Sequence, residues 1–126
     1  MYRVAINNND YTAKSLKELE NYLREDEASQ YREIWIEHDV SKMCALVTGK
    51  EGWLMLLRFE GDVGFSSRNK TYKGSMDEMS NFKLSNGQID EYPLSWSLAE
   101  DDWIMALLHF AETGHPIESV MWHDDS

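Results

Sequence analysis

Hydrophobic and polar residues alternate with a period of two in the first half of the chain. The stretch 31–38, YREIWIEH, places its two isoleucines on one face and its tryptophan and glutamates on the other. Such alternation is typical of a strand with one buried face. The stretches 42–48 and 53–60 are mostly apolar, and short polar connectors separate the three. Together they predict an antiparallel meander of three strands.

Other stretches predict strands toward the two ends of the sequence. Residues 2–6 alternate weakly, and the polar run NNND then breaks the pattern. Residues 79–92 contain two strand-like runs joined by Asn86-Gly87, a dipeptide that favours a type I′ hairpin turn. Residues 118–123, ESVMWH, predict one last short strand.

Two stretches repeat apolar residues at the three- and four-residue spacing of a helix. The first begins at Ser15, and Glu18 follows at the spacing of a capping box. The second begins at Ser97, with Glu100 in the matching position. Gly114 stands where a glycine commonly ends a helix. Both stretches therefore predict helices with defined ends.

These elements predict one α+β domain over residues 1–126, in which a mainly antiparallel sheet of about five to seven strands packs against two helices. The length suits a single domain, and 42% hydrophobic with 28% charged residues is typical of a soluble globular protein. The one cysteine, Cys44, fits a reducing compartment. No apolar run approaches the roughly 20 residues that span a bilayer, and no secretory signal is seen. We expect a cytoplasmic protein that does not bind membranes.

Charge is distributed unevenly along the chain, whose formal net charge is −11. Residues 1–74 hold 12 acidic and 11 basic residues, whereas residues 75–126 hold 11 acidic residues and one basic residue, Lys83. Such a field repels nucleic acid and attracts a basic partner. The other interpretation is that these acids keep a small protein soluble.

The stretch 64–75, GFSSRNKTYKGS, carries Arg68, Lys70 and Lys73 between two glycines, a composition that suggests a phosphate-binding loop. In a P-loop the lysine follows the glycine and leads into a helix, but here Lys73 precedes Gly74 and no helix follows. We therefore expect no binding of nucleotides or nucleic acid. We interpret the stretch as a connector between strands whose bases balance nearby acids.

Catalytic groups do not converge in the sequence. The histidines lack the spacing of zinc ligands; they are His38, His109, His115 and His123. Cys44 falls inside a predicted strand, and the adjacent acids Asp90 and Glu91 point to opposite faces of another. We expect no catalytic, cofactor-binding or metal-binding residues. A small carboxylate- or metal-dependent hydrolase is the alternative hypothesis.

A recognition surface is the remaining kind of site. On the strand 31–38, Trp35 lies between Glu33 and Glu37 on one face. A large aromatic side chain between carboxylates suits an interface anchor. The other interpretation, which we weigh more heavily, is that Trp35 packs beneath a helix.

The second half of the chain resembles a known family. The runs GFSSRNKTYKG, FKLSNGQIDEYP, ALLHFAETGHP and ESVMWH, within roughly residues 64–123, are similar to immunity protein family one of bacterial polymorphic toxin systems. The resemblance implies an α+β fold and a protein that neutralises a sister toxin by binding it without catalysis. The toxins are commonly deaminases and sometimes nucleases. The resemblance also implies mainly structural roles for Gly64, Phe65, Asn86, Gly87 and Trp122.

Charge and resemblance together give one functional hypothesis. The chain is expected to bind a cognate basic toxin domain, a deaminase or a nuclease, and to cover its active site with an acidic surface. Acids at 100–102 already suit the start of a helix, so acids elsewhere are the better candidates. The candidate toxin-binding residues are Asp90 and Glu91 first, then Asp77 and Glu78, and also Glu33, Trp35 and Glu37.

Overall fold

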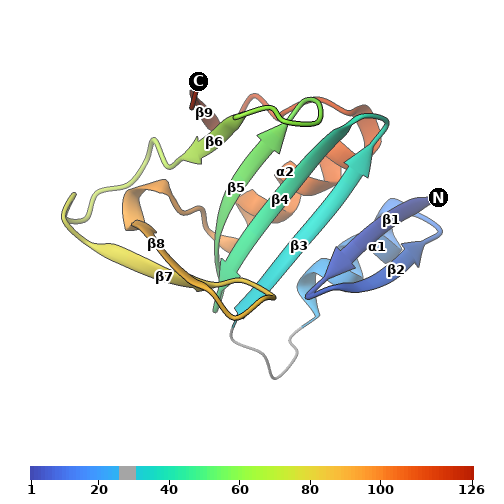
Figure 1. The fold of residues 1–126 in the computed structure, drawn as a ribbon, viewed down its shortest axis with the longest axis horizontal. Helices are drawn as coiled ribbons and strands as arrows, with labels where there is room; N and C mark the ends of the chain where they lie inside the picture. The colour runs from blue at the N-terminus through green and yellow to red at the C-terminus, as the bar shows by residue number, and fades with distance from the viewer. Residues whose placement is uncertain (26–30) are drawn as a thin grey trace.

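A computed structural model describes residues 1–25 and 31–126 and shows an α+β fold (Figure 1). The strands are β1 (Tyr2–Ile6), β2 (Asn9–Ala13), β3 (Tyr31–His38), β4 (Ser41–Thr48), β5 (Glu51–Leu57), β6 (Phe65–Arg68), β7 (Met79–Lys83), β8 (Ile89–Pro93) and β9 (Met121–Asp124). The helices are α1 (Leu16–Arg24), the short 3-10 helix η1 (Leu94–Trp96) and α2 (Glu100–Thr113). Seven strands form one antiparallel sheet in the order β2-β1-β3-β4-β5-β6-β9, while β7 and β8 form a separate hairpin. The predicted fold class is confirmed.

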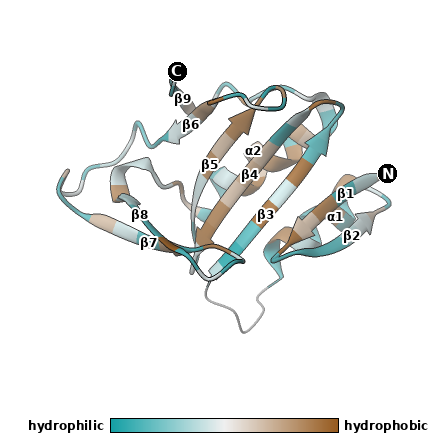
Figure 2. Ribbon diagram, viewed as in Figure 1, coloured by the Kyte–Doolittle hydropathy of each residue, from teal (hydrophilic) through white to brown (hydrophobic). Residues whose placement is uncertain are grey.

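The alternation along the central strands decides which side chains face the helices. Ile34 and Ile36 of β3 are fully buried together with the corresponding residues of β4 and β5. They pack against Leu19 and Leu23 of α1 and against the apolar face of α2, which includes Trp103. In Figure 1 both helices lie behind the sheet, and Figure 2 shows hydrophobic residues along much of β4 and β5. This face of the sheet is therefore covered by the main core.

The β7–β8 hairpin covers part of the opposite face. Phe82 is fully buried there in a second cluster with Cys44 and Trp53. The ring of Tyr92 stacks on that of Trp53, with centroids 4.2 Å apart. Such an aromatic pair adds to the stabilisation that burial alone provides. These contacts fasten the hairpin to the sheet without joining its hydrogen-bond ladder.

The hairpin is where the sequence predicted it, but the type I′ turn was wrong. Among the described residues of the turn only Gly87 has a positive φ, 92°, whereas a type I′ turn needs positive φ at both central residues. The Gly87 N–H donates to the Leu84 carbonyl at 2.9 Å, which closes a type I turn around Ser85 and Asn86. Gly87 then takes the left-handed position that follows such a turn in three-residue hairpin loops.

Two strands were missed because their neighbours, more than their own residues, create them. The polar run after β1 was expected to end the pattern, but Asn7 and Asn8 adopt φ of 50° and 69° and turn the chain into β2. Asparagine tolerates this conformation better than most residues. The stretch expected to be a connector contains β6, which pairs with β5 on one side and β9 on the other.

The first predicted helix cap is confirmed and the second is wrong. Ser15 Oγ accepts a hydrogen bond from the Glu18 N–H at 3.1 Å. Ser97 does not cap α2, which begins after Ala99, because Leu98 forms a bridge with Gly52 that holds the chain extended. Gly114 ends α2 with a left-handed φ of 77°, as expected. The acidic run 25–27, expected to fray the end of the first helix, lies beyond the described residues after 25.

Candidate protein-binding surface

Part of the main sheet faces away from the helices and is not covered by the β7–β8 hairpin. Trp35 stands near its middle, with Ala5 of β1 directly opposite it in the register. Glu37 lies two residues further along β3, opposite Lys42 of β4. Arg3, two residues before Ala5, shares the same face. We call this surface the Trp35 face; its residues are Arg3, Ala5, Asp10, Thr12, Trp35, Glu37, Lys42, Leu57, Phe59 and Glu60.

The Trp35 side chain is held in place by the tip of the hairpin. Its Nε1–H donates to Glu33 Oε2 at 3.0 Å. The same carboxylate accepts hydrogen bonds from Ser85, from the hydroxyl at 3.2 Å and from the backbone N–H at 3.4 Å. Trp35 is partly exposed and packs against the second cluster. The interpretation that it lies beneath a helix was wrong, because alternation turns Ile34 and Ile36 toward the helices and Trp35 away from them.

A shallow hollow lies on each side of Trp35. The one toward β1 and β2 measures about 370 Å³ and is bordered by Arg3, Asp10 and Glu37. The other measures about 240 Å³ and lies against Lys42 and the loop after β5. Phe59 of that loop is 53% exposed, and Val40 is 74% exposed. The Trp35 face therefore offers an aromatic ridge, two recesses and exposed apolar side chains, which are features of a protein-binding surface.

The other predicted acids lie on or beside the β7–β8 hairpin. Asp77 and Glu78 precede β7, and all three carboxylates of Asp77, Glu78 and Glu91 are exposed. In the described part of the chain they make no hydrogen bond or ion pair through their side chains. We call Asp77, Glu78 and Glu91 the hairpin acids. They carry charge that the chain itself does not neutralise.

Asp90 has a structural role that the sequence did not indicate. Its carboxylate accepts hydrogen bonds from Gln88 Nε2 at 2.7 Å and from the Tyr92 hydroxyl at 3.2 Å. Burial, reinforced by the negative charge of Asp90, raises the pKa of Tyr92 to about 12. Asp90 was chosen first because the sequence showed no structural reason for an acid on its strand. The hydrogen bonds to Gln88 and Tyr92 now provide that structural reason. Glu91, on the opposite face of β8, remains available to a partner.

Arg68, in the basic stretch after β5, serves the scaffold. Arg68 lies over the Trp96 ring at 3.7 Å and donates to Ser66 Oγ and to the Ser67 carbonyl, each at 2.8 Å. Asp125 lies 4.0 Å from the same guanidinium, as expected of a base that balances a nearby acid. Burial lowers the pKa of Arg68. Arg68 therefore ties β6 to η1 and to the end of β9.

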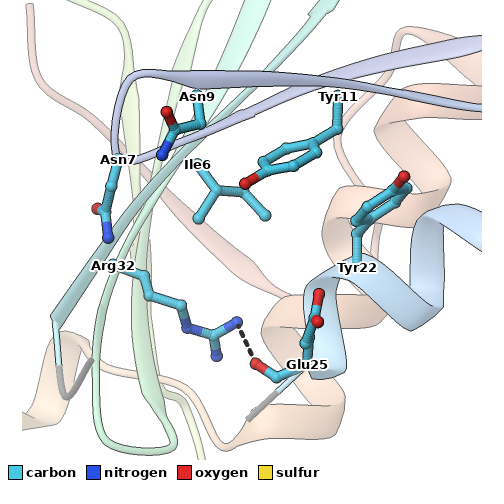
Figure 3. Close-up of a pocket in the computed structure, with 7 residues that line it drawn as sticks. All are labelled: Ile6, Asn7, Asn9, Tyr11, Tyr22, Glu25 and Arg32. Atoms are coloured by element: carbon cyan, nitrogen blue, oxygen red, sulfur yellow. Dashed lines mark hydrogen bonds between the residues drawn. The ribbon is translucent and has the colours of Figure 1, made fainter. Parts of the chain in front are cut away.

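A third hollow, of about 270 Å³, lies between the β1–β2 turn and the end of α1 (Figure 3). Tyr11 and Tyr22 line it, with ring centroids 5.1 Å apart. Figure 3 shows Arg32 reaching from β3 to the Glu25 carbonyl, at 3.5 Å, and the same nitrogen donates to the Leu23 carbonyl at 2.9 Å. A cation here satisfies carbonyls at the end of a helix. Arg32 thus caps α1.

The remaining reactive side chains are separate from one another. Cys44 is buried beneath the hairpin, and burial raises the pKa of its thiol well above the usual value. His38 lies 3.6 Å from Asp39, and His123 lies 3.7 Å from Asp125. Within residues 1–25 and 31–126, no three His, Cys, Asp or Glu side chains are grouped so that they could hold a metal ion. Among the same residues, no helix has the combination of length and hydropathy that crossing a membrane requires.

The structure places Glu33, Trp35 and Glu37 on one face of β3, Glu91 on β8, and Asp77 and Glu78 just before β7. Ser85, at the tip of the hairpin, bonds to Glu33. Sequence reasoning missed the other residues of the Trp35 face: Arg3, Asp10, Lys42 and Phe59. Alternation in residues 2–6 carries the signal for Arg3, but only the strand order places these residues beside Trp35. No family model and no curated protein matches this sequence.

Proposed function

We propose that this chain is an immunity protein that binds a basic toxin domain, a deaminase or a nuclease, in the cytoplasm and covers its active site. One observation carries the proposal: the hairpin acids are exposed and unpaired, and they lie on or directly before an element that aromatic packing holds firmly in place. In the second half, Glu100 and Asp101 lie close to Arg24, whereas the exposed acids Asp102, Glu112 and Glu118 have no such partner among the described residues and are spread over other elements. The hairpin acids therefore carry unneutralised charge that a partner can reach.

The chemistry of the partner follows from this charge. A toxin that acts on nucleic acid needs a cationic surface to hold phosphates. A rigid acidic hairpin competes for the same surface, and opposite charges speed the encounter of two proteins. Because Phe82 and Tyr92 fix the hairpin before binding, little ordering entropy is lost when the partner arrives. The resemblance to immunity proteins supports the same kind of partner.

The test uses the toxin domain encoded beside this gene, inactivated and purified, in surface plasmon resonance at low and high salt. The variant with Asp77→Asn, Glu78→Gln and Glu91→Gln should associate about tenfold more slowly at low salt and dissociate at nearly the same rate. The control neutralises three exposed acids away from the hairpin, namely Asp102→Asn, Glu112→Gln and Glu118→Gln. Wild-type protein should also rescue cells that express the active toxin. The proposal is wrong if wild-type protein neither binds the domain nor rescues the cells.

A further inference from the structure

Two tryptophan rings of this chain lie against an arginine, whereas the partly exposed ring of Trp35 does not. Arg68 lies 3.7 Å from the centre of the Trp96 ring, and Arg32 lies 5.5 Å from that of Trp103. Among the described residues no cation lies over the ring of Trp35. The electron-rich face of an indole attracts cations. Trp35 thus presents an unused surface for a cation from another molecule.

We propose that Trp35, with Glu33 and Glu37, is a receptor for an arginine or lysine side chain on the surface of a basic protein. The inference deepens the function proposed above and rests on it, since the toxin domain is the expected source of that side chain. The cation would lie against the indole, and the carboxylates on either side would accept its hydrogen bonds. Arginine fits best because its planar fork can stack and bond at once.

The geometry around Trp35 is set before a partner arrives. Glu33 fixes the indole through the 3.0 Å hydrogen bond and is itself fixed by Ser85. A side chain that is already ordered loses less conformational entropy on binding, which is a property of interface hot spots. The hollows on either side leave room for the aliphatic part of a long basic side chain.

Charge on the Trp35 face favours a cationic partner. The carboxylates of this face and its border are those of Asp10, Glu33, Glu37 and Glu60, and the cations are Arg3 and Lys42. Lys42 Nζ lies 3.7 Å from Glu37 Oε1, but the Lys42 side chain is 42% exposed and that of Glu37 is 60% exposed. Exposed pairs of this kind contribute little stability. A bidentate guanidinium from the partner can therefore replace Lys42 at Glu37.

The first experiment is independent of the toxin. A short oligoarginine peptide is titrated into ¹⁵N-labelled protein, and chemical shifts are followed by NMR. We expect the largest changes at the Trp35 indole N–H and the Glu37 amide, and about fivefold weaker binding for Trp35→Leu and for Glu37→Gln. Glu37→Gln alters an exposed side chain only, so it tests the site even if Trp35→Leu is less stable. Met105→Ala, an exposed apolar residue of α2, is the control.

Chemical shift changes confined to the hairpin acids, or equal oligoarginine binding by both variants and wild type, would overturn this site.

The second experiment measures dissociation of the toxin domain, which Trp35→Leu should speed about tenfold or more. If wild type fails to bind the toxin while oligoarginine still shifts Trp35, the proposed function fails and the receptor site stands. If the toxin binds Trp35→Leu and wild type alike, the proposed function stands and the site is overturned.

Discussion

Individual charged side chains differ in whether the chain gives them a partner. Arg32 caps α1, Arg68 holds β6 against Trp96, and Arg58 binds Asp62 in the loop after β5. The carboxylates of Asp77 and Glu91 have no such role among the described residues. Partnered charges explain local structure, so the unpartnered ones are where we expect recognition.

Asp62 provides a pH-dependent test of one partnered carboxylate. It accepts hydrogen bonds from the Arg58 backbone, from two nitrogens of the Arg58 guanidinium and from the Gly64 N–H, all between 2.8 and 3.1 Å. These bonds hold the pKa of Asp62 well below its usual value. A lowered pKa means that the ionised form stabilises the fold. That contribution is complete above the unfolded pKa of about 4 and is lost as the pH falls below it.

We therefore expect Asp62→Asn to lower the melting temperature at neutral pH, and the gap from wild type to narrow as the pH falls below about 4. Circular dichroism melting curves over a pH series provide the measurement. Asp77→Asn, which removes an acid without a partner, should show no comparable gap. A gap for Asp62→Asn that stays constant with pH would contradict the assignment.

At the scale of elements, sequence periodicity was sufficient where a strand has its own apolar face. Apart from two short polar connectors, residues 31–57 alternate or are apolar, and the predicted meander is the observed β3-β4-β5. By contrast, β2 and β6 are short and polar, and they exist because β1 and β9 supply their hydrogen-bond partners. The pairing of β6 with β9 joins segments far apart in the sequence, so a local pattern does not show it, whereas β2 was missed because two asparagines form the turn before it. The cap at Ser97 failed for the same reason, because the bridge from Leu98 to Gly52 delays the helix.

The candidate site was also predictable only where a single strand determines it. The alternation of β3 correctly places Glu33, Trp35 and Glu37 on one face. The packing of α1 and α2 decides which face of the sheet the helices cover, and the sequence of one strand does not indicate that face. The internal partners of Asp90 could not be predicted, because Tyr92 lies two residues away on the same strand face and the sequence fits both a solvent-facing pair and a packed pair.

The hairpin offers a test of an element. Gly87 has a φ of 92°, which a β-branched side chain resists, so Gly87→Val should lower the free energy of unfolding by about 1–3 kcal/mol. Urea denaturation measures the change. Asn86→Asp is the matched control, since it keeps a side-chain oxygen for the hydrogen bond from the Gln88 N–H at 2.8 Å. Equal unfolding free energies for Gly87→Val and wild type would show that the turn assignment is wrong.

At the scale of the whole molecule, the net charge of −11 is itself a source of repulsion in the folded state. Added salt screens like charges that lie farther apart than roughly a Debye length of 10 Å. We expect sodium chloride to raise the melting temperature of the wild type at neutral pH. The melting temperature of the variant that neutralises the three hairpin acids should rise less with added salt. Differential scanning calorimetry across a salt series measures both, and a wild-type melting temperature that falls with salt would contradict this view.

The buried thiol of Cys44 beneath the hairpin can report how often the hairpin opens. Cys44 is 2% exposed and shares its apolar cluster with Phe82, so an alkylating reagent reaches the sulfur only after the hairpin lifts from the sheet. When closing is faster than alkylation, the rate of labelling reports the fraction of molecules with the hairpin lifted. A partner that binds the hairpin would lower the rate at which Cys44 is alkylated, whereas a partner that binds only elsewhere on the surface would leave that rate unchanged.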